Sequence, residues 1–597
     1  MAQRTQTYIR RNYKYYLLAL FVILSCIVVG SWLFMRHFKP IFSRQIKKEV
    51  YKVTDSLYHV NFSAIHLNPL LGNLTIDSLY LIPDTGRYSK MRKRTSVPDK
   101  LFDIFVAELK LKHVHLFALI TGKKAKIEAI KAEKSRVKIY QYADSEEQQS
   151  TSIKQTLTQL TSGSLKAIQI KQLGFYHVFF SQKNMNSPQS GTVDLKNLNV
   201  QINDIKIDTA TSRDTSRFLF AKDIRLSMDQ SLFFTTDSLY KISTDSLFFS
   251  VNRGEGFIKD LKVTPRYPEQ QFESQFEFRH NRFAISMGSL LFYDLSPQRI
   301  KRKKWHFKKI KMRDASIDIY LDAALPIKKV EKPLPQKILR NLGFNLRVDT
   351  LKLKNVNIKY RERNPKTNQV GAVSFNQIHG NILNITNDSI QLLKNKYCKV
   401  DLQTLFMNRG KLHAFFDFNL TDLENSFSYK GHLGTIKVHA LNQATHPLGQ
   451  VNLKKGRIYS LDYDMNADNH GAVGKVALNY DQLEVKVLSK SNRKGNLEKQ
   501  GFISLAANLF VIKDANRSDS FAQISYKRDP YRSVFNLMWK SIFTGVKPLI
   551  GIDKKTEQKI KSLKSTKKGK EKAESDGLLN KVKKFLKKTA QKLEGKD

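Results

Sequence analysis

One eight-residue pattern, apolar-x-apolar-x-x-apolar-x-apolar, recurs six times and constrains the fold more than any other feature. Its copies are LTIDSLYL from Leu74, LKLKHVHL from Leu109, IQIKQLGF from Ile168, VQINDIKI from Val200, IKMRDASI from Ile310 and LKLKNVNI from Leu351. Strict alternation places apolar side chains on one face of a strand. The polar two-residue spacer interrupts this alternation, so in a regular strand the second apolar pair would project from the other face. A β-bulge that absorbs one extra residue restores the face. The pattern therefore predicts long, kinked strands with one apolar face and one polar, often basic face.

The apolar positions of these octads are the candidate lining of a groove. The predicted lining residues are Leu74, Ile76, Leu109, Leu111, Ile168, Ile170, Val200, Ile202, Ile310, Leu351, Leu353, Val356 and Ile358. A second recurrent phrase, Asp-Ser or Asp-Thr followed by leucine, marks strand starts. Weak internal repetition of this kind is typical of a sheet that is extended by adding strands.

The charge balance indicates a polyanionic partner. Lysine and arginine total 102 against 53 acidic residues, a net charge of +49 over 597 residues. Such a charge suits nucleic acid or an anionic lipid surface. The two cysteines, Cys26 and Cys398, provide neither a disulfide framework nor a thiolate metal site.

Residues 17–35 carry no charge and predict a single transmembrane helix. Nineteen helical residues rise roughly 28 Å, about one hydrocarbon core. A signal peptide would have a shorter apolar core, and a lipoprotein box at Cys26 would turn polar directly afterwards. Basic residues flank both ends, so the charge bias does not decide the orientation. Because a short N-terminal segment precedes a large body, we expect residues 1–16 in the cytoplasm and the body in the periplasm.

The rest of the chain divides by composition. Residues 36–325 and 326–530 read as two halves of a strand-rich body, separated near a Pro- and Lys-rich stretch, and residues 531–552 as an amphipathic helix. Residues 553–597 form a Lys-rich tail with an amphipathic helix of its own. The predicted membrane-surface residues of the tail are Leu578, Leu579, Val582, Phe585, Leu586, Lys583, Lys584 and Lys587. A solubilising tail or a helix packed on a partner protein is the alternative.

The sequence contains no constellation that supports an enzyme, and we expect no catalytic residues, no metal site and no cofactor. It has no phosphate-binding glycine loop, nucleophile elbow or HExxH motif. The acidic run from Asp462 to Asp468 resembles the start of a calcium loop, but Ala467 and Val473 occupy the glycine and glutamate positions. A strand with a polar face explains that spacing better.

Three segments resemble AsmA-like envelope proteins in their order along the chain. They are residues 61–83, residues 109–140 and residues 431–488, which include the phrase Tyr480-Asp481-Gln482-Leu483. The resemblance implies an inner-membrane helix and a large periplasmic β-groove of the repeating-groove lipid-transfer type. It also implies a link to phospholipid traffic and outer-membrane integrity.

The expected fold is mainly β: one transmembrane helix, a long, twisted, mostly antiparallel β-groove or elongated sheet, few short helices and a basic C-terminal amphipathic helix. The expected function is non-enzymatic shielding or conduction of phospholipid acyl chains between the inner and outer membranes. The expected partners are the inner membrane, phospholipids and an outer-membrane or envelope protein. The alternative is a scaffolding envelope protein with a closed β-sandwich core. A nucleic-acid binder is not expected, because no recognisable module accompanies the charge.

Overall fold

The computed structural model describes residues 54–552, with gaps, and a few residues between 40 and 51. The longest gaps are residues 93–99, 115–123, 143–166, 186–191, 296–303, 491–501 and 505–514. The predicted transmembrane helix, residues 17–35, and the tail beyond residue 552 lie outside the described residues. Among the helices that are described, none is long and apolar enough to cross a membrane.

The protein is mainly β, with a mostly antiparallel open sheet and few short helices. The prediction of a mainly β fold with long, mostly antiparallel strands and few short helices is confirmed. The chain divides into two compact units. Unit 1 comprises the residues up to Phe272, Phe283–Ile317 and Phe344–Lys352, and unit 2 comprises Glu273–Arg282, Asp318–Gly343 and the residues from Leu353 onward.

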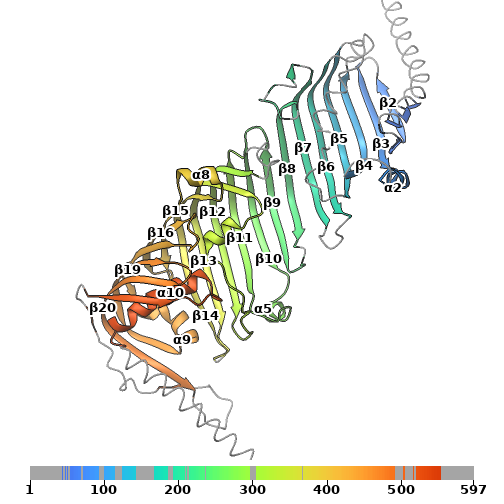
Figure 1. Cartoon of the computed structure of the whole chain (residues 1–597). Coiled ribbons are helices and arrows are strands. Elements are labelled where there is room, and N and C mark those ends of the chain that lie inside the picture. The colour runs from blue at the N-terminus through green and yellow to red at the C-terminus, as the bar shows by residue number, and fades with distance from the viewer. Residues whose placement is uncertain are drawn as a thin grey trace, which may run out of the picture. The chain divides into compact units, whose positions relative to one another are not determined.

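Unit 1 is built of long neighbouring strands, which run from blue to green in Figure 1. The elements are β1 (Tyr58–Asn61), β2 (Ala64–Asn68), β3 (Asn73–Pro83), α2 (Thr85–Arg92), β4 (Lys100–Val114), β5 (Lys124–Gln141), β6 (Ala167–Asn184), β7 (Thr192–Ile207), β8 (Ala221–Phe234), β9 (Tyr240–Ser250), β10 (Glu255–Pro265), α5 (Glu269–Glu273) and β11 (Asn281–Tyr293). Each strand from β3 to β10 pairs with the next one in sequence; β5 and β6 pair in parallel and the other pairs are antiparallel.

Three described strands contribute residues to both units: β11, β12 (Lys304–Asp322) and β13 (Asn345–Arg363). The remaining elements belong to unit 2. They are α7 (Pro335–Arg340), β14 (Val370–Thr386), α8 (Ser389–Lys394), β15 (Tyr397–Phe406), β16 (Gly410–Asn419), β17 (Phe427–Leu433), β18 (Ile436–Lys437), η3 (Val438–Leu441), α9 (Asn442–Gly449), β19 (Val451–Ala467), β20 (Gly471–Lys490), β21 (Phe502–Ser504), β22 (Phe521–Lys527) and α10 (Val534–Leu549).

The octad spacers bend the strands through residues in the left-handed conformation. In five of the six octads the second spacer residue has φ between 49° and 56°: Ser78, His113, Asp204, Asp314 and Asn355. These short polar side chains tolerate that conformation better than β-branched residues do. The remaining octad is IQIKQLGF from Ile168. Its residues Ile170 and Gln172 pair with Ile205 and Asn203 of β7, so the spacer residue Lys171 lies opposite Asp204.

The prediction that each octad contains a β-bulge with one extra residue is wrong for three pairs of strands. These pairs are β3 with β4, β4 with β5, and the octad part of β6 with β7. Asp77 faces Glu108 and Leu79 faces Val106, so the register is unchanged across Ser78. The left-handed residue itself changes the face from which the following side chains project, because it rotates the following peptide out of the regular pleat. Leu79 therefore packs in the same apolar cluster as Ile76, as the octad predicted.

In unit 2, helix α10 covers one face of the sheet at β20 and β22. Leu537 and Leu549 are buried among side chains of β19 and β20, including Met465 and Val476. The α10 segment lies within residues 531–552, where the sequence predicted an amphipathic helix. Burying this apolar face stabilises the helix more than its intrinsic propensity does.

Two small residues let α10 approach the sheet closely. The Ser541 hydroxyl lies 2.5 Å from the Tyr429 hydroxyl, and burial raises the pKa of Tyr429 to about 12. At Gly545, an added Cβ would lie 2.4 Å from Cδ1 of Ile524 and 2.8 Å from Cβ of Val476. The space between helix and sheet is therefore already filled.

We predict that Ser78→Val destabilises β3 by about 1–2 kcal/mol, because a β-branched residue clashes in the left-handed conformation. Ser78→Gly is the matched control and should be tolerated, since glycine adopts positive φ without strain. Hydrogen exchange of the β3 amides measures the local opening free energy. Equal effects of valine and glycine would contradict the assigned conformation.

We predict that Gly545→Ala destabilises unit 2 by about 1–2 kcal/mol, because overpacking outweighs the roughly 1 kcal/mol gained in helix propensity. Gly343→Ala is the control, since nothing lies within 4 Å of its added Cβ. Thermal unfolding of the full chain compares the two variants. An unchanged melting temperature in Gly545→Ala would show that α10 does not pack against β20 and β22 in solution.

Candidate functional site

Two apolar rows cross the strands of unit 1. The first row consists of residues that stand directly opposite one another in successive strands from β2 to β9: Ile65, Ile76, Leu109, Ala132, Phe175, Val200, Leu226 and Phe249. The second row, from β2 to β8, is Leu67, Leu74, Leu111, Ile130, Leu173, Ile202 and Ile224. Directly opposed residues project from the same face of a sheet. With strands about 4.8 Å apart, each row extends roughly 30 Å.

Much of this apolar face remains partly open to solvent. Leu111, Ile202 and Phe249 are half-buried, although apolar neighbours surround them. Other members of the rows are buried, namely Ile65, Leu67, Leu74, Ile76, Ala132 and Ile224. The helices α2 and α5 lie at strand ends (Figure 1). Within the described residues, the clusters along the rows join neighbouring strands of one layer. The face therefore resembles neither a closed sandwich core nor a fully solvated sheet surface.

The structure brings eight of the thirteen predicted lining residues together. Leu74, Ile76, Leu109, Leu111, Val200 and Ile202 belong to the two rows. Ile168 and Ile170 stand opposite Ile207 and Ile205, in the same apolar cluster as Val200 and Ile202.

The other five lie on β12 and β13, where Val356 is buried and Ile310, Leu351, Leu353 and Ile358 are half-buried. The described pairings do not join these five to the rows. Sequence reasoning missed Ile130 and Ala132, because β5 carries no octad and only the register places it within the rows.

Polar residues mark the bend beside the second row. His113, Glu128 and Lys171 come from β4, β5 and β6, and all three are exposed. The Lys171 ammonium donates to Glu128 at 3.0 Å, and Nδ1 of His113 lies 3.2 Å from the same carboxylate. The hydrogen bond and the charge of Lys171 lower the pKa of Glu128. The octad spacers thus gather charged groups next to the apolar rows.

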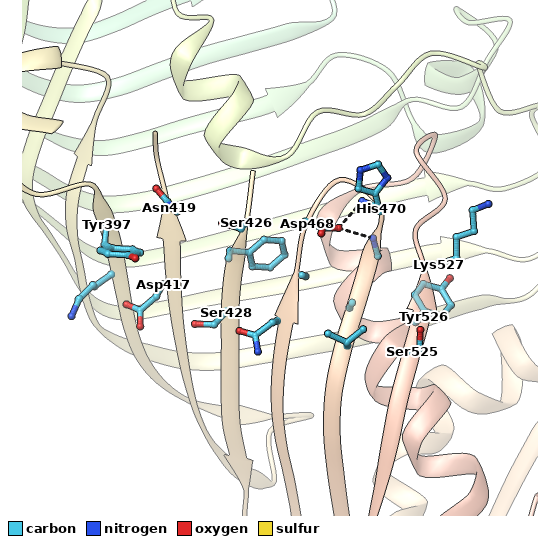
Figure 2. Close-up of a pocket in the computed structure, with 17 residues that line it drawn as sticks. Tyr397, Asp417, Asn419, Ser426, Ser428, Asp468, His470, Ser525, Tyr526 and Lys527 are labelled. Carbon is cyan, nitrogen blue, oxygen red and sulfur yellow. Dashed lines mark hydrogen bonds between the residues drawn. The ribbon is translucent and has the colours of Figure 1, made fainter. Parts of the chain in front are cut away.

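Unit 2 has a separate polar hollow of about 730 Å³ on the face of its sheet, shown in Figure 2. Its lining comes from β15, β16, β17, β19, β20 and β22 and includes Lys399, Asp417, Asn466 and Lys527. These side chains offer hydrogen bonds to a polar group, and Tyr397, Phe427 and Tyr526 in the same lining offer apolar contact. Sequence analysis missed this hollow, because its residues come from six strands that are far apart along the chain.

The acidic run at residues 462–468 lies beside this hollow and is part of a strand. β19 contains Asp462, Asp464 and Asn466, while Met465 and Ala467 point into the core. The Asp468 carboxylate accepts hydrogen bonds from the amides of His470, at 2.7 Å, and Gly471, at 3.0 Å (Figure 2). It therefore closes the turn between β19 and β20, and the strand interpretation of this run is confirmed.

A buried carboxylate pair lies where β12 and β13 end in unit 2. Glu273 is 5% exposed and Asp322 is 6% exposed. The Arg363 guanidinium contacts Asp322 at 2.6 Å, and the Ala324 amide donates to the other Asp322 oxygen at 2.8 Å. Burial, reinforced by the charge of Asp322, raises the pKa of Glu273 to about 7. Asp322 is thus paired with donors, and burial favours the neutral form of Glu273.

No protein-family model and no curated protein sequence matches the chain. The fold itself defines the class at a coarse level, as a β protein with a large open sheet. The predicted membrane-surface residues of the tail lie outside the described residues.

We predict that Glu273→Gln makes the protein more stable at pH 8 and flattens its stability profile between pH 5 and 7. The folded-state pKa of about 7 lies above the usual 4.5. The stabilisation is therefore fully present below pH 4.5 and is lost as the pH rises through 7. Glutamine keeps the shape without the charge, so we expect a gain of about 1–2 kcal/mol at pH 8.

Thermal unfolding of the full chain at pH 5 and pH 8 measures this effect. Glu277→Gln is the control, since Glu277 is exposed in the same unit. A pH profile that stays as steep in Glu273→Gln as in the unsubstituted protein would contradict the assignment.

Proposed function

We propose that the protein is a non-enzymatic, membrane-anchored envelope protein that shields phospholipid acyl chains between the inner and outer membranes. The single observation that supports this proposal is the pair of half-open apolar rows across unit 1. Exposing a sixteen-carbon chain to water costs on the order of 12 kcal/mol at about 0.8 kcal/mol per CH₂. An extended apolar face that covers part of the chain lowers that cost.

The dimensions of the rows support an acyl chain as their occupant. One acyl chain fills half of a hydrocarbon core about 30 Å thick. The rows extend roughly 30 Å, because they cross seven or eight strands about 4.8 Å apart. Each row is thus long enough for a whole chain, and the charged residues at the bend lie where head groups could be bound.

The proposed location is the bacterial inner membrane, with residues 17–35 as the single span and the strand-rich body in the periplasm. The uncharged stretch supports the span. The proposed partners are phospholipids and an outer-membrane or envelope protein. A scaffolding protein whose apolar face packs on another protein is the alternative, and the experiment below separates the two.

We predict that photo-crosslinking residues at Leu111 and Ile202 capture phospholipid in cells. The matched controls are Lys110 and Gln201, which are adjacent in β4 and β7 and project from the opposite face. Mass spectrometry of the adducts identifies what is captured. Phospholipid adducts at Leu111 and Ile202 alone support the proposal. Protein adducts alone at these two positions, or equal lipid capture at the controls, would contradict it and favour the scaffold.

A further inference from the structure

Helix α10 has two apolar faces, and the structure covers only one of them. Leu537, Gly545 and Leu549 face the sheet and are buried. On the opposite side, Phe535 is 73% exposed and Trp539 is 54% exposed. A surface helix ordinarily presents charged and polar residues outward. The outward aromatic residues therefore indicate a binding surface.

The outward aromatic residues form one stripe, which we define as Phe535, Trp539 and Phe543; the first two are exposed and Phe543 is half-buried. Residues four apart differ by about 40° around a helix, so the three lie within an arc of about 80°. The rings of Trp539 and Phe543 stack with centroids 5.5 Å apart. The Lys547 ammonium lies 5.6 Å from the centre of the Phe543 ring. The stripe is thus a continuous aromatic surface with a cation at its C-terminal end.

The charges around the stripe favour an anionic partner. Residues 531–552 contain Lys540 and Lys547 and no acidic residue, while Arg532 is paired with Asp529 at 3.8 Å. Tryptophan and phenylalanine beside lysine are typical of segments that lie in a membrane interface. Lysine stems run along apolar surface and place the ammonium among phosphates. A second copy of this chain fits poorly, because each copy carries a net charge of +49.

We propose that the aromatic stripe of α10 docks on the surface of an anionic phospholipid bilayer. Phe535 and Trp539 enter the boundary between head groups and acyl chains, while Lys540 and Lys547 contact lipid phosphates. This surface lies in unit 2, on residues other than the apolar rows and other than the predicted tail helix. The docking does not require that the rows carry lipid, so the two proposals can fail separately.

The test uses the full chain in phosphatidylcholine nanodiscs, with Trp32→Phe and Trp305→Phe leaving Trp539 as the only tryptophan. Vesicles of brominated phosphatidylcholine with phosphatidylglycerol are then added, and bromine quenches tryptophan that enters the bilayer. We expect Trp539 to be quenched by these vesicles, and less by vesicles of brominated phosphatidylcholine alone. A variant that keeps only Trp305 sets the background.

Substitutions identify the segment responsible, with vesicle binding read by co-flotation. Phe535→Ser with Trp539→Ser should weaken binding about tenfold or more, since two large side chains lose their apolar contact. Each of Lys540→Gln and Lys547→Gln should weaken it about fivefold, at roughly 1 kcal/mol per lysine. Ile390→Ser with Leu393→Ser is the control, because this pair on α8 is 63% and 89% exposed and should leave binding unchanged.

Three results would overturn the proposal. The first is Trp539 that stays unquenched, and the second is equal quenching by neutral and anionic vesicles. The third is binding that survives the double aromatic variant and is lost in Phe585→Ser with Leu586→Ser, which would assign the contact to the tail. None of these results bears on lipid capture at Leu111 and Ile202.

Discussion

The register of the paired segments that carry the two rows, from β2 to β9, is the constraint on which the apolar face of unit 1 depends. Because side chains alternate along a strand, a slip of one residue would turn every apolar side chain of that strand to the other face. Left-handed residues such as Ser78 and Asp204 change the face from which the following side chains project, without changing the register of the strand pairs. Both halves of an octad can therefore serve one face while the hydrogen-bonded ladder resumes beyond each bend.

The two units treat their apolar faces differently. In unit 2, α10 buries the face formed by β19, β20 and β22, and Gly545 and Ser541 bring helix and sheet into close contact. Among the described residues of unit 1, no such helix covers the rows: Leu111, Ile202 and Phe249 stay half-buried, while Ile65, Ile76 and Ala132 are buried between neighbouring strands. Burial of apolar area stabilises a fold by roughly 25 cal/mol per Å². An extended apolar face that leaves part of this stabilisation unused is consistent with a role in binding apolar chains.

Charge and apolar surface lie close together on this protein. Glu128 and Lys171 stand at the bend beside the second row, and Lys547 lies over the end of the aromatic stripe. Phospholipids combine an apolar chain with a charged head group, so a protein that handles them needs both kinds of surface within one molecular length. Glu273 differs, because its burial beside Asp322 favours the neutral carboxyl group instead of a charge available for binding.

The periodicity of the octads determined the strand-rich fold, and it determined that Val200, Ile202, Ile205 and Ile207 share one face, because side-chain direction follows local backbone geometry. It could not show that an unpatterned strand, β5, supplies Ile130 and Ala132, since register arises from pairing between distant segments. Nor could it reveal the polar hollow of unit 2, whose lining comes from six strands. The sequence placed an amphipathic helix at residues 531–552, but only packing decided which of its two apolar sides is buried and which is exposed.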